Sequence, residues 1–266
     1  MLQFFRFHHK FPRLKNPRTF SEKIQYRKLH ERNPRFCVLA DKARVKEEIA
    51  RIVGQRFIIP SLWSGPCLPP VEERIWPAPF VLKANNASKR NLFVRSEEEK
   101  DWPMIEETCR QWLSTGVANF WQENWYNEIE RQIVVEPMLG DRSPGASLVD
   151  YQFFVFGGRA EYVQVDIGEN GHYKRTLFDR NWTRQPFGLK FQIETREIER
   201  PPHFTEMLKA AEKIASEFSF ARVDFYDFES GPKFGEVTFA PSSGYSPFHP
   251  SSYDRVFGDL WKYERN

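Results

Sequence analysis

The sequence has few of the features that mark disulfide-bonded, zinc-binding or membrane-spanning proteins. Its three cysteines, Cys37, Cys67 and Cys109, form no C-x-x-C pair, so they indicate neither a disulfide framework nor a zinc site. This cysteine usage fits a reducing compartment best. No apolar run approaches the roughly 18 residues that a membrane-spanning helix needs, and basic residues within 6–10 interrupt any signal-peptide core. We therefore expect a cytoplasmic protein.

An excess of charge of one sign and the glycine-rich nucleotide motifs are also missing. Lysine and arginine number 39 against 36 acidic residues, and this net charge of +3 does not suggest a nucleic-acid-binding protein. Neither G-x-G-x-x-G nor G-x-x-x-x-G-K-[ST] occurs, which disfavours Rossmann and P-loop folds. Aromatic residues, in contrast, make up 16% of the 266 residues, enough to fill a core and to line a pocket for a flat ring.

The most informative stretch, residues 218–244, predicts two strands joined by a Glu-Ser-Gly-Pro turn. Side chains two apart on a strand share a face, so Arg222 with Asp224, and Glu236 with Thr238, should point the same way. Two carboxylates lie side by side favourably only when a proton or a metal separates them. Hard oxygen ligands of this kind suit Mg²⁺ together with substrate phosphates. A half-buried hairpin whose charges face solvent explains these residues equally well.

The N-terminal part of the chain is predicted to be mainly helical. Residues 1–20 mix Phe with Arg and Lys, a composition that can lie on an anionic membrane surface. We favour a short helix and a loop packed on the main body, because Pro12 and Pro17 cut any helix short. A capping box at residues 19–22 opens the next helix, and a further helix covers about 36–53.

Two apolar strands in the middle of the chain each end beside a charged residue. The first carries Lys83 and continues into the loop 85–91 and a second short strand, a hairpin whose backbone N–H groups can fold over phosphates. A strand-end lysine is the more ordinary interpretation of Lys83. The second strand, 133–135, ends at Glu136, whose carboxylate could bond a purine ring or its sugar. A plain strand end explains Glu136 equally well.

The remaining elements complete an α+β pattern with antiparallel strands, without the regular βαβ alternation of a Rossmann domain. An amphipathic helix is expected at 97–115. A loop at 141–148 leads to a strand that begins at Asp150 and returns through a Gly-Gly turn into an antiparallel partner. The segment that follows clusters three basic residues: His172, Lys174 and Arg175.

Several segments spread along the chain form a joint pattern. They are PRTFSEKIQYRKLHERNP, LADKARVKEEI, IIPSLW, FVLKANNAS, DYQFFVFGG with YVQVD, HYKRTLFDRNW, FARVDFY, FGEVTFAPSSG and YDRVFGDLW. In this order they resemble the ATP-grasp superfamily, in particular its TupA-like branch, which is associated with teichuronopeptide and capsular polysaccharide synthesis. The resemblance extends from about residue 12 to residue 262. Each segment alone is unspecific, whereas the joint match is specific.

The resemblance implies an α+β ATP-grasp fold in which two subdomains clasp ATP. A helical N-terminal region of 1–70 would precede a small subdomain of 71–137 and a large subdomain of 138–266. Lys83 would hold the α- and β-phosphates, the loop 85–91 would cover the triphosphate, and the residues after strand 133–135 would form the adenine hinge. The implied nucleotide-binding residues are Lys42, Lys83, Asn86, Ser88, Glu136, Met138, Leu139 and Asp150.

The resemblance also implies catalytic and metal-binding residues. Lys174 or Arg175 would reach the γ-phosphate, and Arg222 would stabilise the transferred phosphoryl group and the tetrahedral intermediate. The Mg²⁺ ligands would be Asp224, Glu236 and Thr238. The last of these positions is commonly Asn in the superfamily, but a hydroxyl can still ligate Mg²⁺. The branch usually has a glycine-rich loop around His-Gly-Ser-Gly where this chain has residues 86–89, and Gly permits a backbone approach that Ala resists.

The function that the resemblance implies is an ATP-dependent carboxylate–amine ligase that forms an acylphosphate, with ATP and Mg²⁺ as cofactors. Its substrates would be a small-molecule or saccharide carboxylate and an amine, with no nucleic-acid partner. A sugar kinase, a glycosyltransferase and a non-catalytic binding protein stay open, although no Asp-x-Asp occurs for a glycosyltransferase. Peripheral association with the inner face of the membrane, through residues 1–20, also stays open.

Overall fold

The computed structural model of the chain divides into two compact units. Unit 1 comprises residues 1–32 and 145–266, and unit 2 comprises residues 33–144. Residues 1–70, which were predicted to form one helical N-terminal region, are therefore divided between the two units. The limits of the two subdomains that would clasp ATP, 71–137 and 138–266, stay a prediction. The residues that the structure describes are 1–115, 121–140, 148–169, 172–190, 193 and 195–263. Most of the predicted loop at 141–148, and the side chain of His172, lie outside this description.

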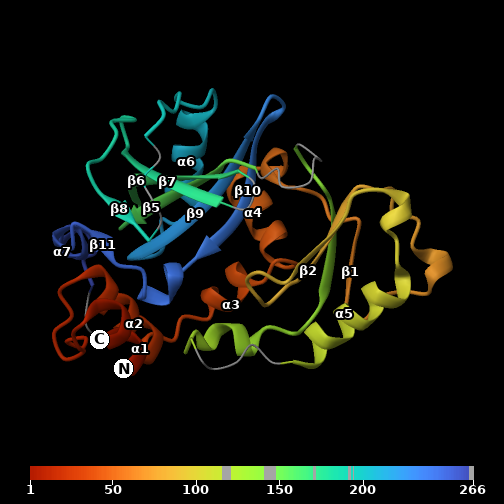
Figure 1. Cartoon of the computed structure of the whole chain (residues 1–266), viewed down its shortest axis with the longest axis horizontal. Coiled ribbons are helices and arrows are strands. Elements are labelled where there is room, and N and C mark those ends of the chain that lie inside the picture. The colour runs from red at the N-terminus through yellow and green to blue at the C-terminus, as the bar shows by residue number, and fades with distance from the viewer. Residues whose placement is uncertain (116–120, 141–147, 170–171, 191–192, 194, 264–266) are drawn as a thin grey trace. The chain divides into compact units, whose positions relative to one another are not determined.

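Unit 2 is built on a four-stranded antiparallel sheet of order β1-β4-β2-β3 (Figure 1). Its strands are β1 (Trp63–Gly65), β2 (Phe80–Ala84), β3 (Asn91–Val94) and β4 (Ile133–Pro137). Its α-helices are α3 (Arg35–Ala40), α4 (Val45–Val53) and α5 (Trp102–Ser114). Its short 3-10 helices are η1 (Gln55–Phe57), η2 (Val71–Glu73), η3 (Glu97–Glu99) and η4 (Asn124–Glu128).

The prediction of one helix over 36–53 is wrong, because α3 and α4 are separate. The break is at Asp41, whose backbone is extended (φ −80°, ψ 110°). Its carboxylate accepts hydrogen bonds from the backbone N–H groups of Ala43 at 2.9 Å and Arg44 at 3.4 Å. An Asp side chain that bonds the backbone just after itself competes with helix formation, so the chain turns here.

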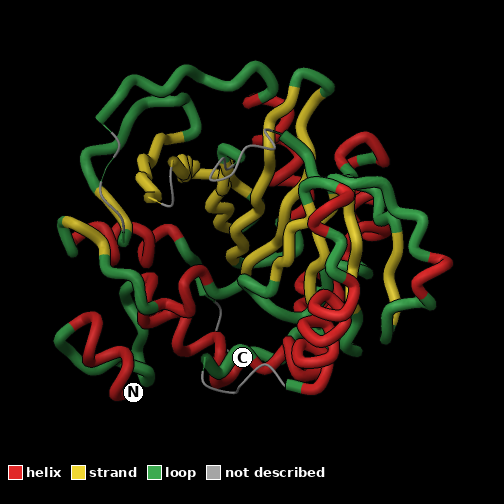
Figure 2. The backbone as a smooth tube through the Cα atoms, turned by 45° about the vertical axis from the view of Figure 1, so that its right-hand side comes forward, coloured by secondary structure: helices red, strands yellow, loops and turns green. Residues whose placement is uncertain are grey.

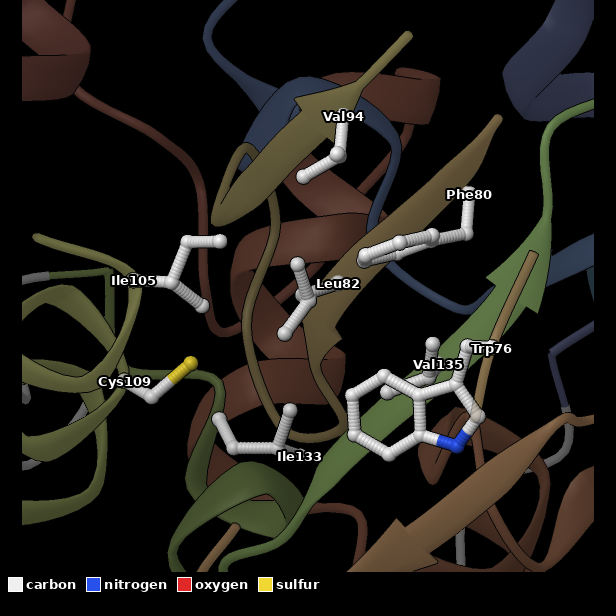
Figure 3. Packing of buried hydrophobic residues seen from close by; sticks show 8 residues of the cluster. All are labelled: Trp76, Phe80, Leu82, Val94, Ile105, Cys109, Ile133 and Val135. Atoms are coloured by element: carbon white, nitrogen blue, oxygen red, sulfur yellow. The ribbon is translucent and has the colours of Figure 1, made fainter. Parts of the chain in front are cut away.

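The core of unit 2 lies between this sheet and α5. Leu82 of β2 and Ile133 of β4 contribute from the sheet, and Ile105 and Cys109 contribute from α5 (Figure 3). The predicted amphipathic helix is confirmed but begins later than expected. Its N-cap is Asp101, whose side chain accepts a hydrogen bond from the N–H of Met104, as N-cap side chains do.

Unit 1 is built on a five-stranded sheet of order β10-β9-β5-β6-β7, antiparallel throughout (Figures 1 and 2). These strands are β5 (Asp150–Phe156), β6 (Arg159–Glu169), β7 (His172–Asp179), β9 (Phe220–Phe228) and β10 (Gly231–Thr238). A small second sheet pairs β8 (Gly188–Leu189) with β11 (Phe248–His249). The helices are α1 (Leu2–His8), α2 (Phe20–His30), α6 (Phe204–Ile214), α7 (Ser252–Leu260) and the 3-10 helix η5 (Pro241–Gly244).

The two faces of the five-stranded sheet differ in chemistry. Phe153 of β5 packs against Phe204 of α6, with ring centroids 5.7 Å apart, so α6 covers one face. On the other face, Phe20 of α2 packs edge-on against Phe220 of β9 at 4.9 Å. The residue two positions further along β9, Arg222, shares that second face. The face that α2 contacts is therefore apolar near α2 and polar further along the strands.

The α2–α7 contact depends on a glycine. A Cβ atom at Gly258 of α7 would lie 2.1 Å from the carbonyl oxygen of Arg18 and 2.8 Å from the Cα of Thr19. We expect Gly258→Ala to lower the free energy of unfolding by at least about 1–3 kcal/mol, because backbone atoms must move to admit the methyl group. Val256→Ala, at an exposed position of α7, is the matched control for urea denaturation. Equal unfolding midpoints for the two variants would contradict the prediction.

Candidate functional site

The residues of the predicted metal-binding hairpin lie on one face of unit 1. Arg222 of β9 is directly opposite Thr238 of β10, but the pairing shifts between Phe234 and Val237. This bulge contains Gly235, where an added Cβ would be only 3.2 Å from the backbone oxygen of Asp224. Bulges re-aim side chains, and Glu236 directly after this glycine reaches the same side as Thr238. The predicted common orientation of the four residues is therefore confirmed.

Arg222 joins the two carboxylates. Its Nε and Nη2 atoms donate to the two carboxylate oxygens of Asp224 at 2.8 and 2.5 Å. Nη2 also donates to Oε1 of Glu236 at 3.0 Å and to Oγ1 of Thr238 at 3.1 Å. A guanidinium thus lies between the two carboxylates and offsets their mutual repulsion.

The charge of Asp224 is strongly affected by its surroundings, because this residue is buried at the centre of the cluster. Burial raises the pKa of the Asp224 carboxyl well above its usual range; Arg222 opposes the rise, and Asp150 and Glu236 add to it. Burial alone would lower the pKa of the Arg222 guanidinium, but the carboxylates of Asp224, Glu236 and Asp150 raise it above its ordinary value. Arg222 is therefore a fixed cation, and the Asp224 carboxyl beside it ionises less readily than a carboxyl in water.

The donor atoms of the cluster fit a magnesium ion in their chemistry. The carboxylates of Asp224 and Glu236 and the hydroxyl of Thr238 are hard oxygen donors, and the hydroxyl lies 3.1 Å from Oε1 of Glu236. Among the described residues, no group of three or more His, Cys, Asp or Glu side chains is arranged to hold a metal ion. These three residues would therefore need phosphate and water oxygens to complete an octahedral shell. Their role as ligands stays a prediction.

A second set of polar side chains continues across the same face toward β7. Asp150 of β5 accepts a hydrogen bond from Gln152 at 2.5 Å through Oδ2, while its buried Oδ1 has no hydrogen-bond partner in the described part of the chain. Burial raises the pKa of Asp150 to about 7. Gln152 in turn accepts a hydrogen bond from Gln164 of β6. The strand register places Gln152 opposite both Gln164 and Asp224, so this row reaches the hairpin.

The two candidates for the γ-phosphate contact, Lys174 and Arg175, lie on opposite faces of the sheet, and the contact itself stays a prediction. Arg175 is paired with Asp166, its Nε and Nη2 atoms lying 2.6 and 2.5 Å from the carboxylate oxygens. Asp166 lies opposite Asp150 in the register, so Arg175 is on the face that carries Arg222. Lys174 precedes Arg175 on β7 and points to the opposite face. Of the two candidates, Arg175 lies on the same sheet face as the hairpin cluster.

In unit 2, the carboxylate of Glu136 pairs with two lysines, the predicted phosphate-binding residue Lys83 and the neighbouring Lys46. Lys83 Nζ lies 2.6 Å from Oε2 of Glu136, and Lys46 Nζ lies 2.6 Å from Oε1. The Glu136 side chain is only 8% exposed. Its burial raises the pKa of the carboxyl, but the two ammonium groups overcome this effect and lower the pKa below its usual value. Burial also lowers the pKa of Lys46, which Glu136 partly offsets.

Lys46 was missed by the sequence analysis. It lies on α4, whereas Lys42 precedes that helix, so helical spacing between the two lysines does not bring them together. The sequence therefore held no local signal that places Lys46 beside Glu136. Lys42 itself donates from Nζ to the backbone oxygen of Ala87 at 2.7 Å, so it supports the loop between β2 and β3.

The predicted triphosphate-covering loop is only partly exposed. Asn85 is fully buried and bonds Asp41 and the backbone of Glu130, both at 2.9 Å. Asn86 is 3% exposed, whereas Ser88 and the residue after it are exposed. The left-handed position of this glycine-free turn is taken by Lys89, with φ at +63°. The nucleotide contacts of Asn86 and Ser88 stay predictions, as do those of the half-buried hinge residues Met138 and Leu139.

Comparison with known proteins identifies one family. The profile described as TupA-like ATPgrasp matches residues 22–262. No curated protein matches the chain significantly. Among solved structures, the chain is similar to a D-alanine–D-alanine ligase from Bacillus anthracis, with 18% identity and a TM-score of 0.47 over 84% of this chain and 65% of that ligase. A RimK domain ATP-grasp protein from Sphaerobacter thermophilus shows 14% identity and a TM-score of 0.43, over 84% of this chain and 67% of that protein. The chain thus spans about two thirds of the length of these proteins.

Proposed function

The chain belongs to the TupA-like ATP-grasp family, and from this premise we propose that it is an ATP-dependent ligase that joins a carboxylate to an amine through an acylphosphate. The observation that carries the proposal is the cluster in which Arg222 holds Asp224 and Glu236 on one sheet face. The association of the family with teichuronopeptide and capsular polysaccharide synthesis supports a sugar acid, or a saccharide that receives an amino acid or peptide, as the carboxylate substrate.

The proposed reaction has two steps. A carboxylate oxygen of the acid attacks the γ-phosphorus of ATP, the bond to the bridging oxygen breaks, and ADP leaves. The amine nitrogen then attacks the acyl carbon and loses a proton, and the acyl carbon–oxygen bond breaks to release phosphate. Phosphoryl transfer of this kind depends mainly on positioning and on positive charge near the phosphoryl oxygens.

The residues of the chain divide these tasks. Arg222 is a largely buried, fixed cation, which suits it to stabilise the transferring phosphoryl group and the tetrahedral intermediate. Lys83, with Lys42 behind the loop, would hold the phosphates of the nucleotide. Asp224, Glu236 and Thr238 would hold Mg²⁺, which when bound neutralises phosphate charge. Glu136 keeps the Lys83 ammonium group in a fixed position until phosphate competes for it.

Phosphate release with ATP and Mg²⁺, across a panel of uronic-acid sugars paired with amino acids, tests the proposal. We expect phosphate only when acid and amine are both present. With a heavy-oxygen-labelled carboxylate, one label should appear in the released phosphate, because the acyl oxygen leaves with the phosphoryl group. A phosphorylated sugar without amide product would indicate a kinase. ATP binding without turnover on any pair would indicate a binding protein, and either result would overturn the ligase.

A further inference from the structure

Helix α1 is held on unit 1 by one of its sides. Phe4 is 1% exposed and stacks on the ring of His8 at 4.2 Å. His8 Nε2–H donates to the carbonyl of Gly244 at 3.0 Å. The ring of Phe7 lies 5.9 Å from that of Tyr245. A seven-residue helix is marginal alone in water, so these contacts keep it folded before it meets any partner.

The other side of α1 and the segment after it expose apolar side chains. Leu2 is 80% exposed, Phe5 45% and Phe11 58%. Phe5 and Phe11 stack on each other at 5.0 Å, so they form one exposed aromatic surface. Together with Met1 and Phe7, five large hydrophobic side chains are exposed within eleven residues. No other stretch of that length in the described part of the chain exposes more than two.

The same segment is purely basic. Five exposed lysine and arginine side chains lie within residues 1–18, and the first acidic residue of the sequence is Glu22. Glu22 is 3% exposed, and its carboxylate accepts hydrogen bonds from the backbone of Arg13, Arg18 and Thr19. It therefore offers little charge to a partner at the surface. The five basic residues are Arg6, Lys10, Arg13, Lys15 and Arg18.

We propose that residues 1–18 form an interfacial docking segment that binds unit 1 to an anionic lipid bilayer. Exposed Leu and Phe side chains can enter the boundary between headgroups and acyl chains, while lysine and arginine interact with anionic headgroups. The binding is peripheral, since no helix in the described residues is long and apolar enough to cross a membrane. A second copy of the chain would bring the same positive charges together. A soluble anionic polymer would leave the aromatic surface in water.

Sedimentation with vesicles made of equal parts phosphatidylcholine and phosphatidylglycerol tests the charged part of the docking segment. Lys10→Gln with Arg13→Gln should lower the vesicle partition coefficient about 25-fold, since each basic residue near an anionic surface contributes about fivefold, or about 1 kcal/mol. Lys209→Gln with Lys213→Gln is the matched control, because it removes the same charge from exposed positions of α6. We expect the control to change the partition coefficient less than about twofold. Equal losses would mean that net charge alone drives binding, and would overturn the proposal.

The apolar part is tested by Phe5→Ser with Phe11→Ser, which changes two exposed side chains and should leave the fold intact. This variant should bind vesicles at least about tenfold more weakly and should lose the binding that persists in high salt, since apolar insertion is not screened. Three results would overturn the proposal. The first is that the wild type does not bind anionic vesicles. The second is that the Phe variant binds as well as the wild type, which would indicate a soluble polyanion as the partner. The third is that the wild type is a dimer and the Phe variant is a monomer, which would indicate a second copy of the chain as the partner.

Discussion

Asp224→Asn is expected to lower kcat for phosphate release by about a thousandfold or more while the chain stays folded. Asp224 is 2% exposed and holds both Nε and Nη2 of Arg222. The amide keeps the shape and one acceptor oxygen but removes the charge that would bind Mg²⁺ and orient the guanidinium. Loss of a single electrostatic contact to a transition state lowers kcat by about 100- to 1,000-fold, and this substitution disturbs two.

Glu229→Gln is the matched control, because Glu229 is exposed at the turn of the same hairpin and the change of charge is the same. Phosphate release should be measured over a range of Mg²⁺ concentrations for both variants. If Asp224 is a ligand, the variant needs more Mg²⁺ for its residual activity. A fall in kcat with an unchanged Mg²⁺ dependence would restrict Asp224 to the positioning of Arg222. Near wild-type turnover would contradict both roles.

The hairpin that carries this prediction could be recognised from the sequence because its pattern is local. Apolar and polar residues alternate along β9, and that alternation alone places Arg222 and Asp224 on one face. The bulge in β10 was not predicted. Its signal is Gly235, a glycine inside a strand pattern, which commonly marks a bulge or a close backbone approach. The break between α3 and α4 was also not predicted, because it depends on one residue: the Asp41 side chain bonds backbone N–H groups that a continuous helix would bond to its own carbonyls.

Local sequence patterns do not show which charged side chains become buried in the tertiary structure. Arg27 and Lys28 of α2 are fully buried, although helical periodicity assigns such residues to the solvent side. Arg27 donates to the backbone oxygens of Phe220 and Phe239, and Lys28 to that of Ser243. These acceptors are about two hundred residues away in the chain. The position of Lys46 beside Glu136 depends on packing of α4 in the same way.

Lys83→Met is expected to weaken the binding of a non-hydrolysable ATP analogue about 10- to 150-fold, the loss of one charge-assisted contact of about 1.5–3 kcal/mol. Lys46→Met is the matched control. Both ammonium groups lie 2.6 Å from the Glu136 carboxylate, so each variant leaves Glu136 with one lysine. If Lys83 binds phosphate and Lys46 only holds Glu136, titration calorimetry should show a loss of a few-fold at most for Lys46→Met.

Equal losses for the two lysine variants would contradict that division of roles and would mean that both ammonium groups reach phosphate. Glu136→Gln separates the remaining possibilities. Removal of the carboxylate charge releases both lysines, so the affinity for the triphosphate should rise if Glu136 competes with phosphate for them. It should fall if Glu136 serves mainly to hold Lys83 in place. A rise for Glu136→Gln together with unequal lysine variants would establish Glu136 as an internal anion that the nucleotide displaces from Lys83.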